Sequence, residues 1–251
     1  MRVLVLIPTY NERDNVERAV FGVLQHAGFG AIVLDDASPD ETGQIAAELA
    51  ARFPDRVQYV PRPRKEGLGR AYLHGMAIAL THQPDLICQM DADGSHDPAD
   101  LPRLAAAAAA GSQLVIGSRY VSGGRLVNWP GRRKALSWFG NAYARIAMGL
   151  RVRDCTAGYR CWRPEAVRHL LSAELRSDGY AFQLETLYEA TSQGGRVSEL
   201  PITFTERRHG VSKMSLLVIL EAMTLPWRIR ARVRHRIRRM DMATHAARDR
   251  L

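Results

Sequence analysis

Three short segments of this 251-residue chain contain acidic side chains of the kind that bind metal ions and phosphorylated ligands. They are Tyr10-Asn11-Glu12, Asp35-Asp36 and Asp91-Ala92-Asp93, and an apolar run precedes each of them. Mg²⁺ and Mn²⁺ prefer oxygen ligands, usually one or two carboxylates completed by phosphate oxygens and water. We therefore predict that Asp91 and Asp93 hold a divalent ion against the phosphates of a bound ligand.

The Asp-x-Asp tripeptide is weak evidence when taken alone. The chain has 14 aspartates, so chance alone gives roughly one such tripeptide in a sequence of this length. Its position directly after the apolar residues 86–90 favours a functional role. A calcium-binding EF-hand loop is excluded, because Gly94 is misplaced and Pro102 stands where that loop needs glutamate.

Short apolar strands alternate with amphipathic helices through the first half of the chain. The pattern predicts strands over 2–7, 31–35, 57–60, 86–90 and 114–117, with helices between them and after Pro98. This alternation indicates an α/β fold of the Rossmann-like type, with a mainly parallel sheet flanked by helices. Ligands of such sheets gather at the carboxyl ends of the strands. The three acidic segments are therefore expected to meet in one crevice.

The second half of the chain shows a looser pattern. It predicts a long loop from Gly123 to Gly131, helices over 135–148 and 179–191, and a strand over 197–204. Residues 154–160 are polar and contain glycine. Pro201 falls near the middle of the last strand, where proline marks an edge or a bend.

Other residues have both a ligand-binding and a structural interpretation. Asp36 is predicted to accept hydrogen bonds from a nucleobase or ribose, since Asp40 already suits the N-cap of the next helix. Glu12 is equally well explained by interaction with a helix dipole. Arg119, together with Arg207 and Lys213 of the loop 204–213, is a candidate ligand for phosphate. A solvated basic loop is the alternative for that segment.

Charge is concentrated at the C-terminus. The chain carries a net charge of +9, of which residues 228–251 supply +7. Residues 215–227 are apolar but too short to span a bilayer, and Glu221 and Pro226 interrupt them. Seven arginines then follow within residues 228–239. A membrane-interfacial helix and a packed helix with a solvated basic end explain this pattern equally well. Nucleic-acid binding is a weaker alternative, because no accompanying motif is present.

We expect one α/β domain over 1–213, the apolar-then-basic helix over 214–240 and a frayed tail over 241–251. The three cysteines are too few for a disulfide framework and indicate reduced thiols in a cytosolic protein. The sequence predicts neither a signal peptide nor a transmembrane helix. The expected location is cytoplasmic and peripheral, on the cytoplasmic face of the membrane.

The sequence resembles the polyprenol-phosphate (dolichol-phosphate) mannosyltransferases of glycosyltransferase family 2. The resemblance covers about residues 3 to 220, with its motifs in family order. They are Pro8-Thr-Tyr-Asn-Glu12, Asp35-Asp36-Ala-Ser-Pro-Asp40, Gly67-Leu-Gly-Arg-Ala-Tyr-Leu-His-Gly-Met76, Met90-Asp-Ala-Asp-Gly-Ser-His96, Gly117-Ser-Arg-Tyr120, Asp154-Cys-Thr-Ala-Gly158, Gly179-Tyr-Ala-Phe-Gln-Leu-Glu185 and Arg207-x-x-Gly-x-Ser-Lys213. The early Asp-Asp and Asp-x-Asp motifs belong to the whole family, and the glycine-rich and later motifs indicate the polyprenol-phosphate branch.

The resemblance implies a GT-A fold, a GDP-mannose donor, Mg²⁺ or Mn²⁺ as cofactor and a polyprenyl monophosphate acceptor. It implies inverting transfer, which gives a β-linked mannosyl phosphate. Asp91, Asp93, Arg119, Arg207 and Lys213 would be catalytic, with Asp93 the main metal ligand. The same five residues would bind the donor, together with Pro8, Tyr10, Glu12, Leu34, Asp36 and Ala92. Candidates for the acceptor phosphate are Ser95, Arg132, Arg133 and Ser212.

Two positions depart from the family pattern. Gly94 replaces an apolar residue, and Trp138 stands where many relatives have an arginine, so Arg132 or Arg133 is expected to replace that charge. The spacing of the residues does not identify the sugar. A related transferase that uses UDP-glucose or a UDP-N-acetylhexosamine is the alternative, and a nucleotide- or nucleic-acid-binding module is the alternative outside enzymes. A separate membrane subunit remains an open partner.

Overall fold

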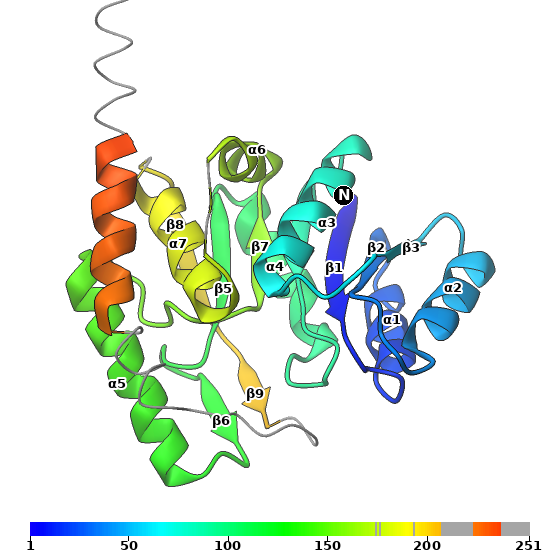
Figure 1. Cartoon of the computed structure of the whole chain (residues 1–251), viewed down its shortest axis with the longest axis horizontal. Coiled ribbons are helices and arrows are strands. Elements are labelled where there is room, and N and C mark those ends of the chain that lie inside the picture. The colour runs from blue at the N-terminus through cyan, green and yellow to red at the C-terminus, as the bar shows by residue number, and fades with distance from the viewer. Residues whose placement is uncertain (174, 176, 193, 207–222, 237–251) are drawn as a thin grey trace, which may run out of the picture.

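A seven-stranded sheet forms the centre of the protein (Figure 1). The structure is a computed structural model that describes residues 1–173, 175, 177–192, 194–206 and 223–236. The sheet order is β3-β2-β1-β4-β7-β5-β8. All neighbouring strands are parallel except β7, which is antiparallel to both β4 and β5. The strands are β1 (Val3–Thr9), β2 (Phe29–Asp35), β3 (Val57–Pro61), β4 (Leu86–Gln89), β5 (Leu114–Ser118), β7 (Arg160–Trp162) and β8 (Val197–Pro201).

Helices cover both faces of this sheet (Figure 1). Side chains alternate along β1, so Leu4 and Leu6 pack into one apolar cluster while Val5 and Ile7 pack into the other. Burial on both faces explains why these strands read as continuous apolar runs. One face is covered by α1 (Val16–Leu24), α2 (Thr42–Arg52) and α4 (Leu101–Ala109), and the other by α3 (Leu68–Thr81), α6 (Pro164–Ser172) and α7 (Gly179–Ser192). The predicted α/β fold with a mainly parallel sheet is confirmed.

Two elements that lie next to each other in the second half, β7 and α6, were not predicted. Residues 154–160 suggest only a polar loop, yet β7 begins at Arg160 and lies between β4 and β5. A three-residue strand is too short to show a period, and its arginine and tryptophan are both fully buried. Helix α6, which follows directly, buries Ala166, Val167 and Leu170 against the core.

The predicted strand over 197–204 is two strands rather than one. β8 ends at Pro201 on the edge of the main sheet, and after Ile202 the chain continues as β9 (Thr203–Thr205). β9 pairs in parallel with β6 (Arg125–Val127) in a separate small sheet, inside the segment predicted as a loop. Pro201 therefore marks both an edge and a change of direction, as proline does when it cannot donate to a ladder.

The C-terminal part of the chain packs against the domain. A helix over 223–236 lies beside α5 (Gly131–Met148) and α7 (Figure 1), and buries Ile229 and Val233 in the core. Only part of the predicted helix over 214–240 is described. No helix in the described part of the chain is long and apolar enough to cross a membrane.

Three arginines of this helix contact the domain. Arg232 pairs with Glu185 and Arg236 with Glu189, and both carboxylates are fully buried on α7. Arg230 donates to the carbonyl of Ala147 at 2.7 Å. The described part of this helix therefore packs on the domain, as in the interpretation of the tail as a packed helix.

Candidate active site

The carboxyl ends of β2, β1 and β4 lie next to one another, because these three strands are neighbours in the sheet. The three acidic segments predicted from the sequence follow these strand ends. They are joined by backbone bonds, such as that from the Asp36 amide to the Thr9 carbonyl at 3.0 Å. The predicted convergence of the segments is confirmed.

The loop after β4 holds Asp91 and Asp93 by short contacts. The hydroxyl of Tyr72 donates to Asp91 at 3.1 Å, and the amide of Ser95 donates to Asp93 at 3.0 Å. Burial raises the pKa of Tyr72, and the charge of Asp91 raises it further, so the phenol stays protonated and can donate. Gly94 has a φ of +76°, a conformation that side chains rarely allow.

His96 is buried behind the same loop and forms a hydrogen bond with its backbone. Its Nδ1 accepts the amide proton of Asp91 at 3.0 Å, so Nε2 carries the ring proton. The ring stacks on Tyr159, with centroids 4.6 Å apart. Burial lowers the pKa of His96, while the charges of Asp91 and Asp93 oppose that shift. The imidazole is therefore neutral and serves as a rigid acceptor for the loop.

A pocket of about 220 Å³ opens beside these carboxylates. It brings together Asp91, Asp93, Ser95, Arg119 and Arg133, all of which the sequence had selected. The remaining lining residues come from the start of α3, the loop after β4, the segment just before β7, the helix α7, and the small sheet with the residues that follow β6. They are Leu68, His96, Trp129, Thr156, Gly158, Gly179, Tyr180, Gln183 and Phe204.

Arg119 is held tightly within this pocket. Its guanidinium binds both oxygens of the fully buried Asp154, at 2.8 and 2.7 Å, and donates to Thr156 at 2.9 Å. Burial pulls the pKa of Arg119 down, but the charge and hydrogen bonds of Asp154 outweigh it, so the pKa lies above its ordinary value. The cation is permanent, and a fixed partner sets its orientation.

The residues predicted to contact the nucleoside lie on the other side of the loop, along β1 and β2. Asp36 is buried and pairs with Arg62, so a nucleoside would meet this ion pair rather than a lone carboxylate. The ammonium of Lys65 lies 3.6 Å above the ring of Tyr10. The carboxylate of Glu12 accepts a bond from Asn15 at 2.8 Å, which fits a local structural role.

The remaining predicted residues fall in different environments. Pro8 is half-buried in β1 and Ala92 is buried in the loop after β4. The side chain of Leu34 lies entirely in the core, so only its backbone can reach a nucleoside. Arg133 pairs with Glu206 and stacks on Trp129, whereas Arg132 is exposed. Arg207, Ser212 and Lys213 lie outside the described residues.

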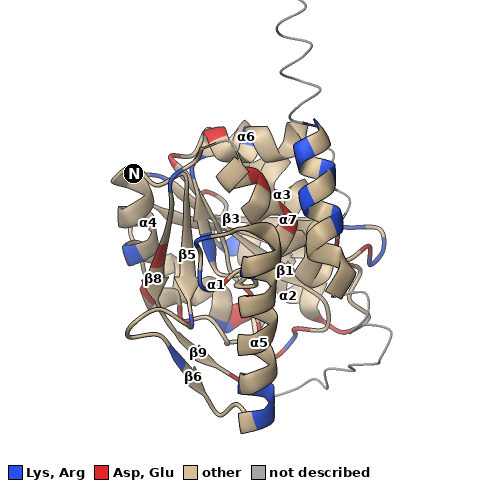
Figure 2. Cartoon of the chain, turned by 90° about the vertical axis from the view of Figure 1, so that its left-hand side faces the viewer, with Lys and Arg blue, Asp and Glu red and all other residues tan. Residues whose placement is uncertain are grey.

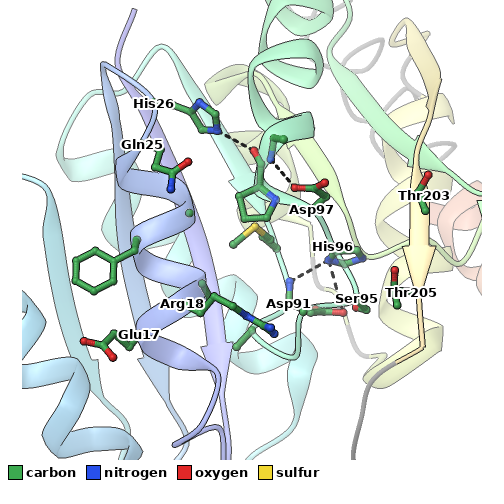
Figure 3. A pocket seen from close by; sticks show the side chains of 18 residues that line it. Glu17, Arg18, Gln25, His26, Asp91, Ser95, His96, Asp97, Thr203 and Thr205 are labelled. Carbon is green, nitrogen blue, oxygen red and sulfur yellow. Dashed lines mark hydrogen bonds and ion pairs between the residues drawn. The ribbon is translucent and has the colours of Figure 1, made fainter. Parts of the chain in front are cut away.

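A second pocket, of about 660 Å³, lies between α1 and the outer side of the same loop. Figure 3 shows Arg18 reaching from α1 toward this loop, and His26 bound to the Pro98 carbonyl at 2.9 Å. Its polar groups are partly engaged with one another. Because it shares Asp91 and Ser95 with the smaller pocket, the loop separates two cavities.

The carboxylates suit a hard divalent cation. Asp91 and Asp93 are only partly buried and face the pocket. Within the described residues no group of three or more His, Cys, Asp or Glu side chains is arranged to hold a metal. Two carboxylates without a closed cage fit Mg²⁺ or Mn²⁺, which complete their shells with phosphate oxygens and water.

Comparison with known proteins decides the family. The model of glycosyl transferase family 2 matches residues 4–171. The polyprenol monophosphomannose synthase of Mycolicibacterium smegmatis is 48% identical over 92% of this chain and 89% of that protein. The undecaprenyl-phosphate mannosyltransferase of Micrococcus luteus is 45% identical over 89% of this chain and 91% of that protein. The chain belongs to glycosyltransferase family 2.

The fold of this glycosyltransferase agrees with that assignment. Glucosyl-3-phosphoglycerate synthase of Mycobacterium tuberculosis, solved with Mn²⁺, UDP-glucose and phosphoglyceric acid, superposes with a TM-score of 0.64. The match covers 90% of this chain and 79% of that one at 20% identity, which is informative for the fold alone. The GT-A type predicted from the sequence is confirmed.

Several residues that shape the glycosyltransferase site were not selected from the sequence. Asp154, Tyr72, His96 and Gln183 all lie inside recognised motifs, but no chemical role was assigned to them. A hydroxyl, an imidazole and an amide give no local signal of the partner they reach. Asp154 is visible as an acid, but the sequence does not show that it pairs with a buried arginine.

Proposed function

We propose that this glycosyltransferase moves mannose from GDP-mannose to a polyprenyl monophosphate, with inversion at the anomeric carbon. The observation that carries the proposal is the pocket in which Asp91 and Asp93 face Arg119 and Arg133. Acids and fixed cations in one small cavity suit a reaction between two phosphate-bearing substrates. The names of the two bacterial relatives support mannose and polyprenyl phosphate as the substrates.

Each charge has a task in this proposal. Asp91 and Asp93 would hold Mg²⁺ or Mn²⁺, which when bound would neutralise charge on the departing diphosphate. Arg133 is half-exposed at the start of α5, so it could bind the acceptor phosphate together with Ser95 by exchanging its ion pair with Glu206. Arg119 is already neutralised by Asp154, so it adds an oriented N–H donor rather than a free charge. Arg207, Ser212 and Lys213 remain predicted ligands on the basis of sequence.

The acceptor makes a strong base unnecessary. A phosphate oxygen is anionic near neutral pH, so no group needs to remove a proton before attack. The protein then contributes alignment of the two substrates and stabilisation of the leaving diphosphate. The carboxylates are therefore assigned to the donor rather than to proton transfer. Attack by the phosphate oxygen opposite the leaving group inverts the anomeric centre.

We also propose that α5 and the C-terminal helix face a lipid surface. Leu136, Phe139, Tyr143 and Ile146 recur every three or four residues and so share one side of α5. Three of them are exposed, and Tyr143 accepts a bond from exposed Trp227 at 3.0 Å. Figure 2 looks onto α5 and the C-terminal helix, with basic residues at the lower end of α5 and along the C-terminal helix. Apolar side chains flanked by cations suit the headgroup region of an anionic membrane.

The alternatives are a different sugar nucleotide and a different class of partner. UDP-glucose or a UDP-N-acetylhexosamine would place the same diphosphate on the same carboxylates. Nucleic-acid binding is less favoured, because Arg230, Arg232 and Arg236 are engaged within the protein. The cytoplasmic face and a separate membrane subunit stay predictions.

Substitution of one carboxylate tests the proposal. Purified protein with Mg²⁺ or Mn²⁺ and polyprenyl phosphate is given a panel of labelled sugar nucleotides. We expect mannosyl lipid from GDP-mannose, and a loss on the order of a thousandfold in Asp93→Ala, because the oxyanion-type stabilisation is removed. Asp55→Ala, which removes an exposed carboxylate elsewhere, should keep full activity. Near-normal transfer by folded Asp93→Ala would refute the role of this residue. If the wild type transfers a different sugar from the panel, that sugar replaces mannose in the proposal.

A further inference from the structure

Gln183 on α7 is a buried amide whose polar atoms are unsatisfied. Its side chain is 3% exposed, and within the described residues neither its oxygen nor its nitrogen has a hydrogen-bond partner. A buried unpaired polar atom costs about 1–3 kcal/mol, so such groups are rare in native folds. The hydroxyl of Ser95, also buried, is in the same condition. Both residues line the pocket that contains Asp91 and Asp93.

The position of the amide is fixed relative to the carboxylates. A Cβ placed on Gly158 would lie 3.7 Å from the Gln183 amide nitrogen and 3.7 Å from an Asp91 carboxylate oxygen. These two atoms are therefore no more than twice that distance apart, and the side chain that Gly158 lacks would lie between them. Gly158 thus leaves open a small space bounded by an amide and a candidate metal ligand.

Neighbouring contacts hold Gln183 in place from behind. Its backbone carbonyl accepts a bond at 2.9 Å from Arg160, which is fully buried. The adjacent Phe182 stacks parallel to Tyr72, with centroids 6.1 Å apart. Tyr72 in turn donates to Asp91. The amide is thus presented to the pocket by a rigid part of α7 that is tied to the carboxylate loop.

The hydrogen-bonding character of an amide selects the class of ligand. A phosphate oxygen accepts hydrogen bonds, so it would satisfy the amide nitrogen and leave the amide oxygen unpaired. A sugar hydroxyl both donates and accepts, so one or two of them would satisfy both atoms. The group transferred from a sugar nucleotide must lie directly beside the diphosphate, which is where this amide lies if Asp91 and Asp93 hold that diphosphate.

We propose that Gln183 binds hydroxyl groups of the donor's hexosyl unit and so determines which sugar is accepted. This inference rests on the proposed function for the placement of the donor. It adds a residue that reads the sugar rather than the nucleotide or the acceptor. Gly158 belongs to the same subsite, because any side chain there would occupy the space that the sugar needs.

Binding and transfer by Gln183→Met test this role. Methionine keeps the size of the side chain but removes both polar atoms. We expect the affinity for GDP with Mn²⁺, measured by calorimetry, to stay within about twofold of the wild type, and kcat/KM for the sugar nucleotide to fall on the order of tenfold to a hundredfold. Gly158→Ala should give the same split, because its Cβ makes only ordinary contacts within the protein.

Monodeoxy donors show which hydroxyl is bound. In the wild type, removal of that hydroxyl should weaken binding relative to GDP, and in Gln183→Met the same removal should have no further effect. Thermal unfolding distinguishes a sugar-binding role from a structural one. Removing an unpaired buried amide in Gln183→Met should leave the melting temperature unchanged or higher. A lower melting temperature with unchanged sugar discrimination would contradict the proposal.

The binding arm needs neither acceptor nor turnover. A wild-type protein that binds sugar nucleotides but transfers no mannose would refute the proposed function and leave the role of Gln183 open to the same measurement. For each sugar nucleotide of the panel, its affinity is divided by the affinity of the matching nucleoside diphosphate. If this ratio is the same in the wild type and in Gln183→Met for every sugar, Gln183 does not bind the sugar and the role is overturned. Equal loss of both affinities would also overturn it, since the residue would then serve the nucleotide.

Discussion

The loop that carries the two carboxylates depends on a single glycine. Gly94 follows Asp93 with a φ of +76°, and a Cβ there would collide with the guanidinium of Arg18. The end of an arginine side chain moves easily, so the contact is a minor obstacle. The backbone conformation is the larger one, because a left-handed residue with a side chain is disfavoured by roughly 1–2 kcal/mol.

Gly94→Ala should therefore destabilise the protein by about 1–2 kcal/mol and lower its melting temperature by a few degrees, since a chain of this size loses about 2–4 °C per kcal/mol. The matched control is Gly140→Ala, where the added Cβ meets nothing within 4 Å and lies inside α5. There alanine should stabilise the helix by about 0.5–1 kcal/mol. Equal melting temperatures for the two variants would contradict the strain argument.

Individual residues were predictable to different degrees. The position of Asp91 and Asp93 at the pocket could be predicted, because acids that directly follow a buried strand lie at the carboxyl edge of the sheet. The partner of Arg119 could not, since Asp154 lies 35 positions away and many acids compete for that role. The burial of Leu34 in the core was hidden as well, because a leucine at a strand end reads equally well as core or as ligand contact.

Among the elements, the helix over 223–236 is attached by its charges as much as by its apolar side. Glu185 is fully buried on α7, accepts the amide proton of Ser177 at 2.9 Å and pairs with Arg232. Removing the cation would leave the buried carboxylate of Glu185 with fewer compensating contacts, which is more costly than losing a fully exposed pair.

Arg232→Met should accordingly destabilise the protein by about 1–3 kcal/mol, measured by urea unfolding. Arg234→Met, which removes an exposed arginine from the same helix, should cost less than about 0.5 kcal/mol. The double variant Glu185→Gln/Arg232→Met should recover part of the loss, because the buried charge is gone. If the Arg232 and Arg234 variants unfold at the same urea concentration, the ion pair does not hold the helix.

Helices and strands were predicted correctly where their apolar pattern extends over enough residues to show a period. The strands and helices of the first half are confirmed because each buries a regular face in the sheet layers. β7 was not predictable, since three residues show no period and its Arg160 suggests solvent. That arginine is buried because its guanidinium donates to the carbonyls of Ala157, Cys155 and Gln183 and to the hydroxyl of Thr186. Burial lowers the pKa of Arg160 to about 10.

For the whole molecule, the question is how a chain with a net charge of +9 meets a lipid substrate. Arginines of the C-terminal helix divide into two groups. Arg230, Arg232 and Arg236 contact the domain, whereas Arg228 and Arg234 are exposed on the same helix as Trp227. Among the arginines that the structure describes on this helix, the second group is the more available to anionic headgroups, together with the apolar side of α5.

Charge reversal at Arg228 and Arg234 tests whether anionic membranes attract this side of the protein or only its net positive charge. Arg228→Glu/Arg234→Glu should weaken binding to anionic vesicles at low salt by at least roughly tenfold, because each cation near the surface contributes about 1 kcal/mol. Arg13→Glu/Arg168→Glu has the same net charge but changes exposed positions elsewhere, and should bind within about twofold of the wild type. Vesicle sedimentation measures all three proteins. Equal weakening in both double variants would mean that net charge alone attracts the protein, and absence of wild-type binding would refute a membrane-facing side.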